Sequence, residues 1–197
     1  MNRIDIINEC LRTQELDAIE SIDVDYEPYA AEANSLIDKV NKELQSTGCY
    51  FNKYSTVLQK NSNNEIILPA NTLYFYAKDI SLLYTIRNNK LYDLKNQTFE
   101  FEKDVEGDIV ILVDVIETPY DFYNYVYYSV VYEFLLTKEG EQMKQRYLMK
   151  MQDAKRNYTS TNSLMLNMNS INNPYFAKIT GRRFIRSYNG RKVWERH

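Results

Sequence analysis

The chain has 197 residues, with 24 basic and 27 acidic side chains and a formal net charge of −3. Hydrophobic residues make up 44% of the sequence and aromatic residues 14%, which is enough for a folded core and excludes a wholly disordered chain. The length suits one domain, or two small ones that share a core. Five glycines and four prolines exclude collagen-like and flexible low-complexity chains.

The sequence offers few residues for metal binding or acid–base catalysis. Its only histidine is His197, and its two cysteines, Cys10 and Cys49, fit no metal-binding or redox spacing. The glycines are too scattered for a phosphate-binding loop, and no nucleophile elbow is present. A carboxylate pair for glycoside hydrolysis stays open, because such pairs have no sequence signature. We expect no cofactor, no metal site and no enzymatic activity.

No membrane-spanning segment is predicted. The longest uncharged aromatic run, residues 122–132, is shorter than the roughly 20 residues that a spanning helix needs. The first residues lack the apolar core of a signal peptide. We therefore expect a protein that is soluble where it is made and has no membrane contact when assembled.

The first part of the chain has helical periodicity. In residues 4–14, Ile4, Ile7 and Leu11 share one face. The strongest predicted helix of this half covers residues 29–47, because apolar side chains recur there every three or four residues: Ala30, Ala33, Ile37, Val40 and Leu44. Gly48 is placed to end this helix.

The middle of the chain changes to β-type patterns. Short strands are predicted at residues 50–58, 65–68, 73–76, 82–86, 91–93 and 98–102. The Asn88-Asn89 pair signals a hairpin turn. Residues 108–115 form a continuous β-branched run, which predicts a strand buried on both faces.

Helical patterns return after residue 117. Thr118 is suited to the N-cap and Pro119 to the first position of a helix that runs to about Leu136. This helix is apolar or aromatic on nearly every side, which predicts burial on more than one side. A last helix is predicted over residues 138–158.

The C-terminal arm differs in charge from the rest of the chain. Residues 178–197 hold seven basic residues and one acidic residue, for a net charge of +6. The rest of the chain has 17 basic and 26 acidic residues, for a net charge of −9. Such an arm either binds nucleic acid or docks on an acidic partner protein, and composition does not separate the two. A turn at Asn189-Gly190 predicts a hairpin that pairs Ile185 with Trp194.

A series of ordered motifs extends over residues 5–167. They are Ile7-Asn-Glu-Cys-Leu11, Ala30-Ala-Glu-Ala33, Leu44-Gln45-Ser46-Thr-Gly48 with Phe51-Asn52, Ile66-Ile-Leu68-Pro69-Ala-Asn71-Thr-Leu73, and Leu91-Tyr92-Asp93 followed by Thr98-Phe99. In order and spacing they resemble the tail tubular protein A family of short-tailed bacteriophages. The chain departs from the family pattern at Cys49, where a tryptophan is usual, and at Asn88-Asn89, where the family has a glycine-rich turn. Residues beyond 170 are not covered.

The resemblance implies a structural protein of the virion tail, made in the host bacterial cytoplasm. Such proteins form a homo-oligomeric ring, typically of twelve copies, between the portal protein and the tail nozzle protein. They often help to seat tail fibre proteins, and DNA passes through the ring without specific binding. The implied fold is α+β. Residues 1–48 and 117–160 would form a helical bundle, residues 49–116 a β-rich insertion and residues 161–197 an extended basic C-terminal arm.

Two sets of residues are predicted to contact partners. Tyr127 and Val131 are expected at the subunit interface, because a ring subunit buries surface against two neighbours. The portal-binding hypothesis names seven residues of the arm: Arg182, Arg183, Ile185, Arg186, Arg191, Lys192 and Trp194. The alternative function is a nucleic-acid-binding packaging or regulatory protein that uses the same arm.

Overall fold

The computed structural model describes residues 2–22, 28–171, 182–186 and 192–196. Helices and strands occupy separate stretches of these residues and the sheets are antiparallel, which confirms the α+β class. In chain order the elements are α1 (Arg3–Arg12), α2 (Pro28–Gln45), β1 (Lys53–Leu58), β2 (Thr72–Ala77), β3 (Tyr84–Arg87), β4 (Lys90–Asp93), β5 (Val105–Ile111), the 3-10 helix η1 (Val115–Glu117), α3 (Tyr120–Leu136), α4 (Glu141–Ile171), β6 (Arg182–Arg186) and β7 (Lys192–Arg196).

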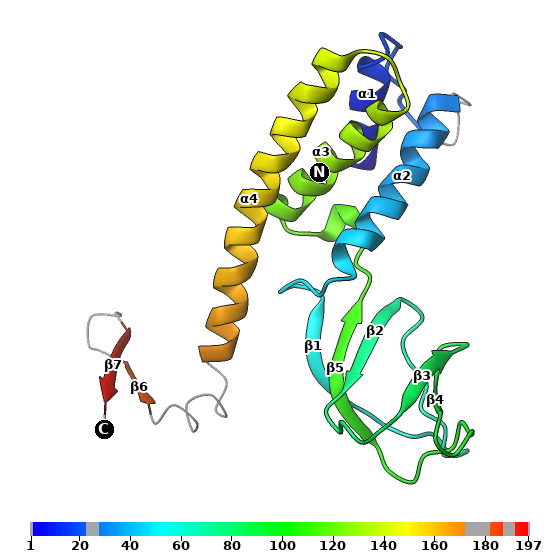
Figure 1. Ribbon diagram of the computed structural model, residues 1–197, viewed down its shortest axis with the longest axis vertical. Helices are drawn as coiled ribbons and strands as arrows, with labels where there is room; N and C mark the ends of the chain where they lie inside the picture. Colours follow the sequence, from blue (N-terminus) through cyan, green and yellow to red (C-terminus); the bar gives the residue numbers. More distant parts are fainter. Residues whose placement is uncertain (1, 23–27, 172–181, 187–191, 197) are drawn as a thin grey trace.

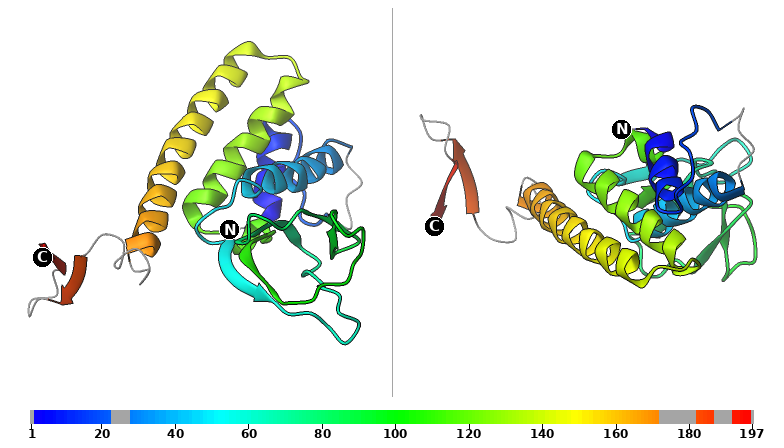
Figure 2. Two further views of the ribbon diagram at one scale, coloured as in Figure 1. Left: turned by 60° about the horizontal axis from the view of Figure 1, so that its bottom comes forward. Right: turned by 90° about the horizontal axis from the view of Figure 1, so that it is seen from above.

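Helix α3 lies at the centre of the helices and contacts α1, α2 and α4 (Figures 1 and 2). This arrangement explains why α3 is apolar on nearly every side, as the sequence predicts. Its buried side chains join those of the other helices in one hydrophobic core, which includes Ile7, Leu11, Ala33, Ile37, Phe122, Val126, Val130, Val131, Phe134, Tyr147 and Tyr158. Helix α1 begins with a capping box, in which the Asn2 side chain accepts from Ile4 N and the Asp5 carboxylate accepts from Asn2 N.

A three-stranded antiparallel sheet with the order β1-β5-β2 follows α2 in the chain. One of its faces packs on a second hydrophobic cluster through Leu58, Phe75, Val105 and Ile109. The other face, which we call the outer sheet face, is open around Glu106 in the central strand, whereas Val110 on the same face is buried. The prediction of a strand buried on both faces therefore holds for Ile109 and Val110, which lie on opposite faces and are each 1% exposed, but it does not hold along the whole run. The β-branched run continues past the end of β5 into the turn before η1, so it does not represent a single strand.

Gly107 allows β2 and β5 to approach each other closely. A Cβ atom at this position would lie 2.4 Å from the carbonyl oxygen of Tyr76 and 2.5 Å from Cζ of Phe75. Both distances are too short for a real contact, so only glycine fits here.

The β3–β4 hairpin turns at Asn88-Asn89, as predicted. Both asparagines have positive φ angles, 51° and 58°, which is the conformation of a two-residue type I′ turn. The strands predicted at residues 65–68 and 98–102 are reduced to isolated bridges such as Ile67 to Lys90. Pro69 has no N–H group for a ladder, which helps to keep the first of these segments short.

A buried cluster of amide side chains joins the end of α2 to the chain that leaves β5. Gln45 donates from Nε2 to the Val113 carbonyl at 2.7 Å and accepts from the Val113 N–H at 2.9 Å. Asn41 donates to the same carbonyl at 3.0 Å. Asn52 donates to the carbonyl oxygens of Gln45 and Ile111 at 3.2 and 3.0 Å. We call this set of contacts the amide clasp, and it ties the helices to the three-stranded sheet.

Two helix ends differ from their predicted positions. Thr118 is not the N-cap of α3, because its hydroxyl donates to the Val115 carbonyl within η1. Pro119 occupies the N-cap position and α3 begins at Tyr120. Helix α4 starts at Glu141 and continues to Ile171, well past the predicted end at residue 158. Residues 161–171, which the sequence analysis places in the extended arm, are therefore helical. Over the described residues, the longest helices do not combine the length and apolarity needed to cross a bilayer.

Strands β6 and β7 form a separate antiparallel sheet in the basic part of the chain. The register pairs Phe184 with Trp194 and Ile185 with Val193. The predicted pairing of Ile185 with Trp194 is therefore wrong by one residue. The predicted turn at Asn189-Gly190 lies outside the described residues.

Candidate functional site

The structure separates the two residues predicted for subunit contact. Val131 lies in the helical core of one chain and has no exposed surface. Tyr127 is half-buried at the margin of this core, with its ring centroid 5.1 Å from that of Tyr128. Burial raises the pKa of Tyr127, and the nearby Glu9 carboxylate adds to the effect, so the phenol stays neutral. Contact with a second subunit stays a prediction for Tyr127, whereas Val131 has no exposed surface for such a contact.

Near Tyr127, a nearly buried carboxylate connects α1 with α4. Glu9 accepts hydrogen bonds from Nη2 and Nε of Arg12 at 2.6 and 2.9 Å, and from the hydroxyl of Tyr147. Burial alone would raise the pKa of Glu9, but these hydrogen bonds lower it, and the net pKa lies below the ordinary value. Burial raises the pKa of Tyr147 to about 12. The carboxylate therefore stays ionised at neutral pH and holds the helices together.

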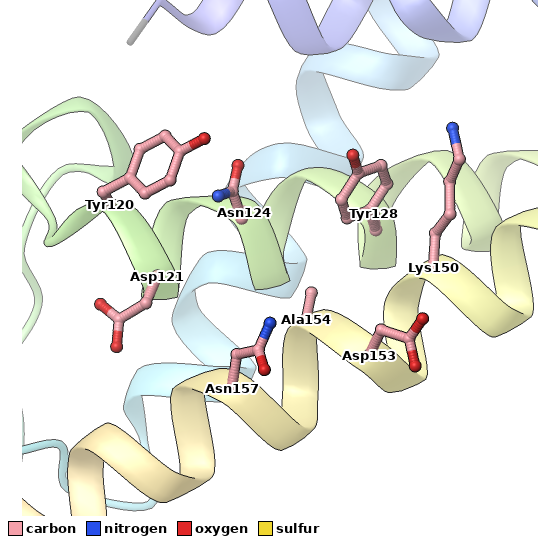
Figure 3. Close-up of a pocket in the computed structure, with 8 residues that line it drawn as sticks. All are labelled: Tyr120, Asp121, Asn124, Tyr128, Lys150, Asp153, Ala154 and Asn157. Carbon is pink, nitrogen blue, oxygen red and sulfur yellow. The ribbon is translucent and has the colours of Figure 1, made fainter.

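A cleft of about 320 Å³ lies between α3 and α4 (Figure 3). The close-up shows Asp121 on α3 and Asn157 on α4 on facing turns of the two helices. The lining side chains are aromatic, amide and charged: Tyr120, Asp121, Asn124, Tyr128, Lys150, Asp153, Ala154 and Asn157.

Most charged groups of the cleft already have partners. Asp153 forms an ion pair with Arg156 one turn further along α4. The Nζ atom of Lys150 lies 5.4 Å from the ring centroid of Tyr128, within the range of a cation–π contact. Asp121 Oδ2 is buried without a hydrogen-bond partner among the described residues. The cleft thus combines paired charges with one buried carboxylate oxygen and several amide and aromatic side chains.

The two cysteines are not placed to act as reactive thiolates. Cys10 and Cys49 are both buried as free thiols. Burial raises the pKa of Cys10 to about 12, so its thiolate is not formed at neutral pH. Among the residues that the structure describes, histidine, cysteine and carboxylate side chains form no group of three that is placed to hold a metal ion.

The outer sheet face is the second surface that could meet a partner. The register places Ser55, Asp108 and Tyr76 side by side across the three strands, and Tyr74 lies two residues from Tyr76 on the same face. The two tyrosine rings stack with centroids 6.2 Å apart, and both remain exposed. Alternation in the sequence indicates two faces for β2, but it does not tell which one is covered.

Six of the seven residues in the portal hypothesis lie on described strands. Arg182, Arg183, Ile185 and Arg186 belong to β6, and Lys192 and Trp194 belong to β7. Arg191 lies outside the described residues. The strand pairing brings the two groups of basic residues into one hairpin. Its binding partner stays a prediction.

The sequence matches the family described as "Tube: Tail tubular protein" over residues 4–174. The chain therefore belongs to the tail tubular protein family, which confirms the resemblance seen in its motifs. Among curated proteins it is similar to tail tubular protein A of Klebsiella phage KP34, with 29% identity over 119 residues. That match covers 60% of this chain and 63% of the relative, so less than two thirds of the relative's length is represented. Family membership supports a structural role in a bacteriophage tail and suggests a non-enzymatic one.

Proposed function

We propose that this protein is a ring-forming head-to-tail adaptor, which joins the portal to the tail nozzle and lines the DNA channel. The observation that carries the proposal is the family match over residues 4–174. In this proposal the protein acts in the virion tail at the head-to-tail junction, after synthesis in the host cytoplasm. It has no catalytic role, and it contacts portal, nozzle and tail fibre proteins.

The proposed subunit has a helical bundle, from residues 1–48 and 117–160, and a β-rich insertion at residues 49–116. The separate hydrophobic clusters around the helices and the sheet support this division. The amide clasp gives the two parts a fixed junction, which suits a subunit that transmits force along a tail. Within the bundle we retain Tyr127 for subunit contact. Val131 is buried inside its own chain and offers no surface.

The charge distribution suits a channel through which DNA slides. Residues 1–177 carry a net charge of −9, so the body of each subunit repels phosphate. A ring of about twelve such subunits, the copy number typical of the resembled family, multiplies this effect. The acidic body therefore favours passage of DNA without specific binding.

The basic residues of β6 and β7 are proposed to dock on the portal. Residues 178–197 carry a net charge of +6, which requires a partner with negative surface charge. A strand pair is also suited to adding to the edge of a partner's sheet. Phosphate-binding arms directed into the channel would retard DNA, so the portal is the better partner.

The direct test of this function is the location of the protein in the particle. Electron cryomicroscopy of intact virions, compared with particles whose copy carries a small fused tag near residue 62, should show extra density on a ring between portal and nozzle. Residues 62 and 63 form an exposed turn, so a tag there is tolerated. Extra density elsewhere in the particle, or no incorporation of the untagged protein, would contradict the proposal.

A second function is favoured by the same +6 charge. In this alternative the protein binds nucleic acid during packaging or regulation through its basic residues. It would then shift DNA in gel electrophoresis at physiological salt, and the shift would disappear when residues 178–197 are deleted.

A further inference from the structure

The end of α4 extends past the hydrophobic core of the helices. Tyr147, Ala154 and Tyr158 are buried, and Asn162 still accepts a hydrogen bond from the backbone N–H of Tyr50 at 2.9 Å. Beyond this contact Leu164 is 61% exposed. Figure 1 shows the last turns of α4 beside the strands and below the other helices. We call residues 159–167 the α4 terminal segment.

The α4 terminal segment lacks the features that stabilise an exposed helix. Residues 157–177 contain no charged side chain, although 26% of the whole chain is charged, so no ion pairs support the last turns. Residues 159–163 are threonine, serine or asparagine, all of which are weak helix formers. A helix of this composition depends on packing for its stability. Its apolar residues Leu164 and Met165 remain exposed among the described residues, so they are available to a further packing surface.

The outer sheet face carries exposed aromatic and apolar side chains on which a helix could pack. Tyr74, Tyr76 and Val57 are 46%, 52% and 53% exposed, and the strand register puts all three on this face. Helices commonly pack on the open face of an antiparallel sheet, because each element then buries its apolar side. A layer that covers these three side chains would complete the sheet.

The charges of the outer sheet face are already neutralised within the face. Asp108 accepts from Ser55 Oγ at 2.6 Å and lies 3.4 Å from Lys53 Nζ. Glu106 accepts from Lys78 Nζ at 2.5 Å. A charged partner would find no free opposite charge on this face, so its own charges would be buried without partners. An uncharged helix avoids this cost, whereas the basic hairpin and DNA do not.

We propose that the α4 terminal segment of one copy packs on the outer sheet face of a second copy. The contact joins two different patches of the same chain, so repetition around an axis generates a closed ring or an open helix. The inference rests on the proposed ring and adds which surfaces form it. Leu164 and Met165 contact the region around Tyr76 and Val57. The carboxylates of the two ion pairs, Asp108 and Glu106, lie between these side chains on the central strand, so the contact covers charges that are already paired.

A cysteine pair tests this contact in the assembled protein. We would replace Val57 and Leu164 together by cysteine in phage, isolate the tails and oxidise them mildly. The native cysteines, Cys10 and Cys49, are buried and should not react. Non-reducing electrophoresis should show a ladder at multiples of 23.4 kDa for the double variant. Val57→Cys alone and Leu164→Cys alone should give no ladder.

The possible outcomes are distinct. If the double variant is present in tails but stays at 23.4 kDa, the contact does not exist or lies within one chain, and the inference is wrong. If the wild-type chain is absent from isolated tails, the adaptor function fails, and the contact fails with it. As a second measurement, Leu164→Asp should abolish incorporation into tails. Leu136→Asp is the matched control, because Leu136 is 53% exposed at the other end of the helices and should be incorporated normally.

Discussion

Gln45 pairs with both backbone groups of Val113, in the way that a neighbouring strand would. Its Oε1 atom accepts from the Val113 N–H at 2.9 Å, and its Nε2 atom donates to the Val113 carbonyl at 2.7 Å. The side chain is fully buried, so water does not replace either bond. Gln45 thus provides hydrogen-bond partners for the backbone where the chain leaves the sheet. These bonds fix the direction in which the chain continues to the helices.

Replacing Gln45 by methionine should destabilise the protein at this junction. The size of the side chain is kept, but the Val113 N–H loses its hydrogen-bond partner, whereas the Val113 carbonyl keeps the bond from Asn41. Each buried group that loses its partner costs about 1–3 kcal/mol. We expect a clear loss in the free energy of unfolding in urea, and Gln59→Met at an exposed position should change it little. Equal stability of the two variants would show that the amide clasp is not needed.

Gly107→Ala should destabilise the three-stranded sheet. The added methyl group would lie 2.4 Å from the Tyr76 carbonyl oxygen and 2.5 Å from the Phe75 ring, so the strands must move apart. Such overpacking costs about 1–3 kcal/mol. Thermal unfolding should record a lower Tm for this variant, while Glu106→Ala, at the exposed neighbouring position, stays close to the wild type. An unchanged Tm for Gly107→Ala would contradict the close approach of β2 and β5.

The Glu9 contacts should make part of the stability depend on pH. The pKa of Glu9 is lowered in the folded state, mainly by hydrogen bonds from Arg12 and Tyr147 that outweigh the effect of burial. A lowered folded-state pKa gives stability that is present above the unfolded value of about 4.3 and is lost as the pH falls through the folded-state pKa. Glu9→Gln should therefore be less stable than the wild type at pH 7, and the difference should shrink below about pH 4.3.

Urea unfolding of both proteins between pH 7 and pH 3 measures this difference. Other carboxylates with lowered pKa values, such as Asp93 and Asp108, contribute equally to both proteins and cancel in the comparison. Glu20→Gln is the control, because Glu20 is exposed. A difference for Glu9→Gln that stays constant over the whole range would refute the ionised contact with Arg12 and Tyr147.

Deleting residues 178–197 should leave the fold intact and weaken binding to the portal. The hydrophobic clusters take their buried residues from positions up to Tyr158, so circular dichroism and Tm should change little. The Kd for the portal should rise by about tenfold or more near 0.15 M salt, and the difference should narrow at 1 M salt, where charges are screened. Arg182, Arg183 and Arg186 replaced together by glutamine should reproduce the effect. A truncated chain that binds the portal normally but no longer binds DNA would assign the basic residues to nucleic acid.

The periodicity of apolar residues predicts the secondary structure correctly where packing and local conformational preference agree. The apolar stripe of α2, the all-round burial of α3 and the Asn88-Asn89 turn are all found where the sequence places them. The length of α4 was not predictable, because its last turns consist of weak helix formers and carry no charge. The strand register near Ile185 depends on the length of the connection, which the strand pattern does not define.

The candidate surfaces are harder to predict from the sequence than the helices and strands, because they depend on tertiary structure. Gln45 and Asn41 are polar residues on the buried side of a helix, and only the approach of Val113 explains them. Val131 is an apolar residue of the kind found in subunit interfaces, but its side chain is buried within its own chain. The exposed tyrosines of β2 cannot be identified as a surface from the sequence, because the strand pattern does not show which face of the sheet is covered.

The mass of the purified protein, alone and mixed with its portal, tests the adaptor function most directly. Native mass spectrometry should detect a closed species of many copies of the 23.4 kDa chain, either alone or bound to the portal ring. This species should persist at salt concentrations that prevent binding to DNA. A chain that remains at 23.4 kDa with and without the portal, and that shifts DNA at physiological salt, would contradict the adaptor function.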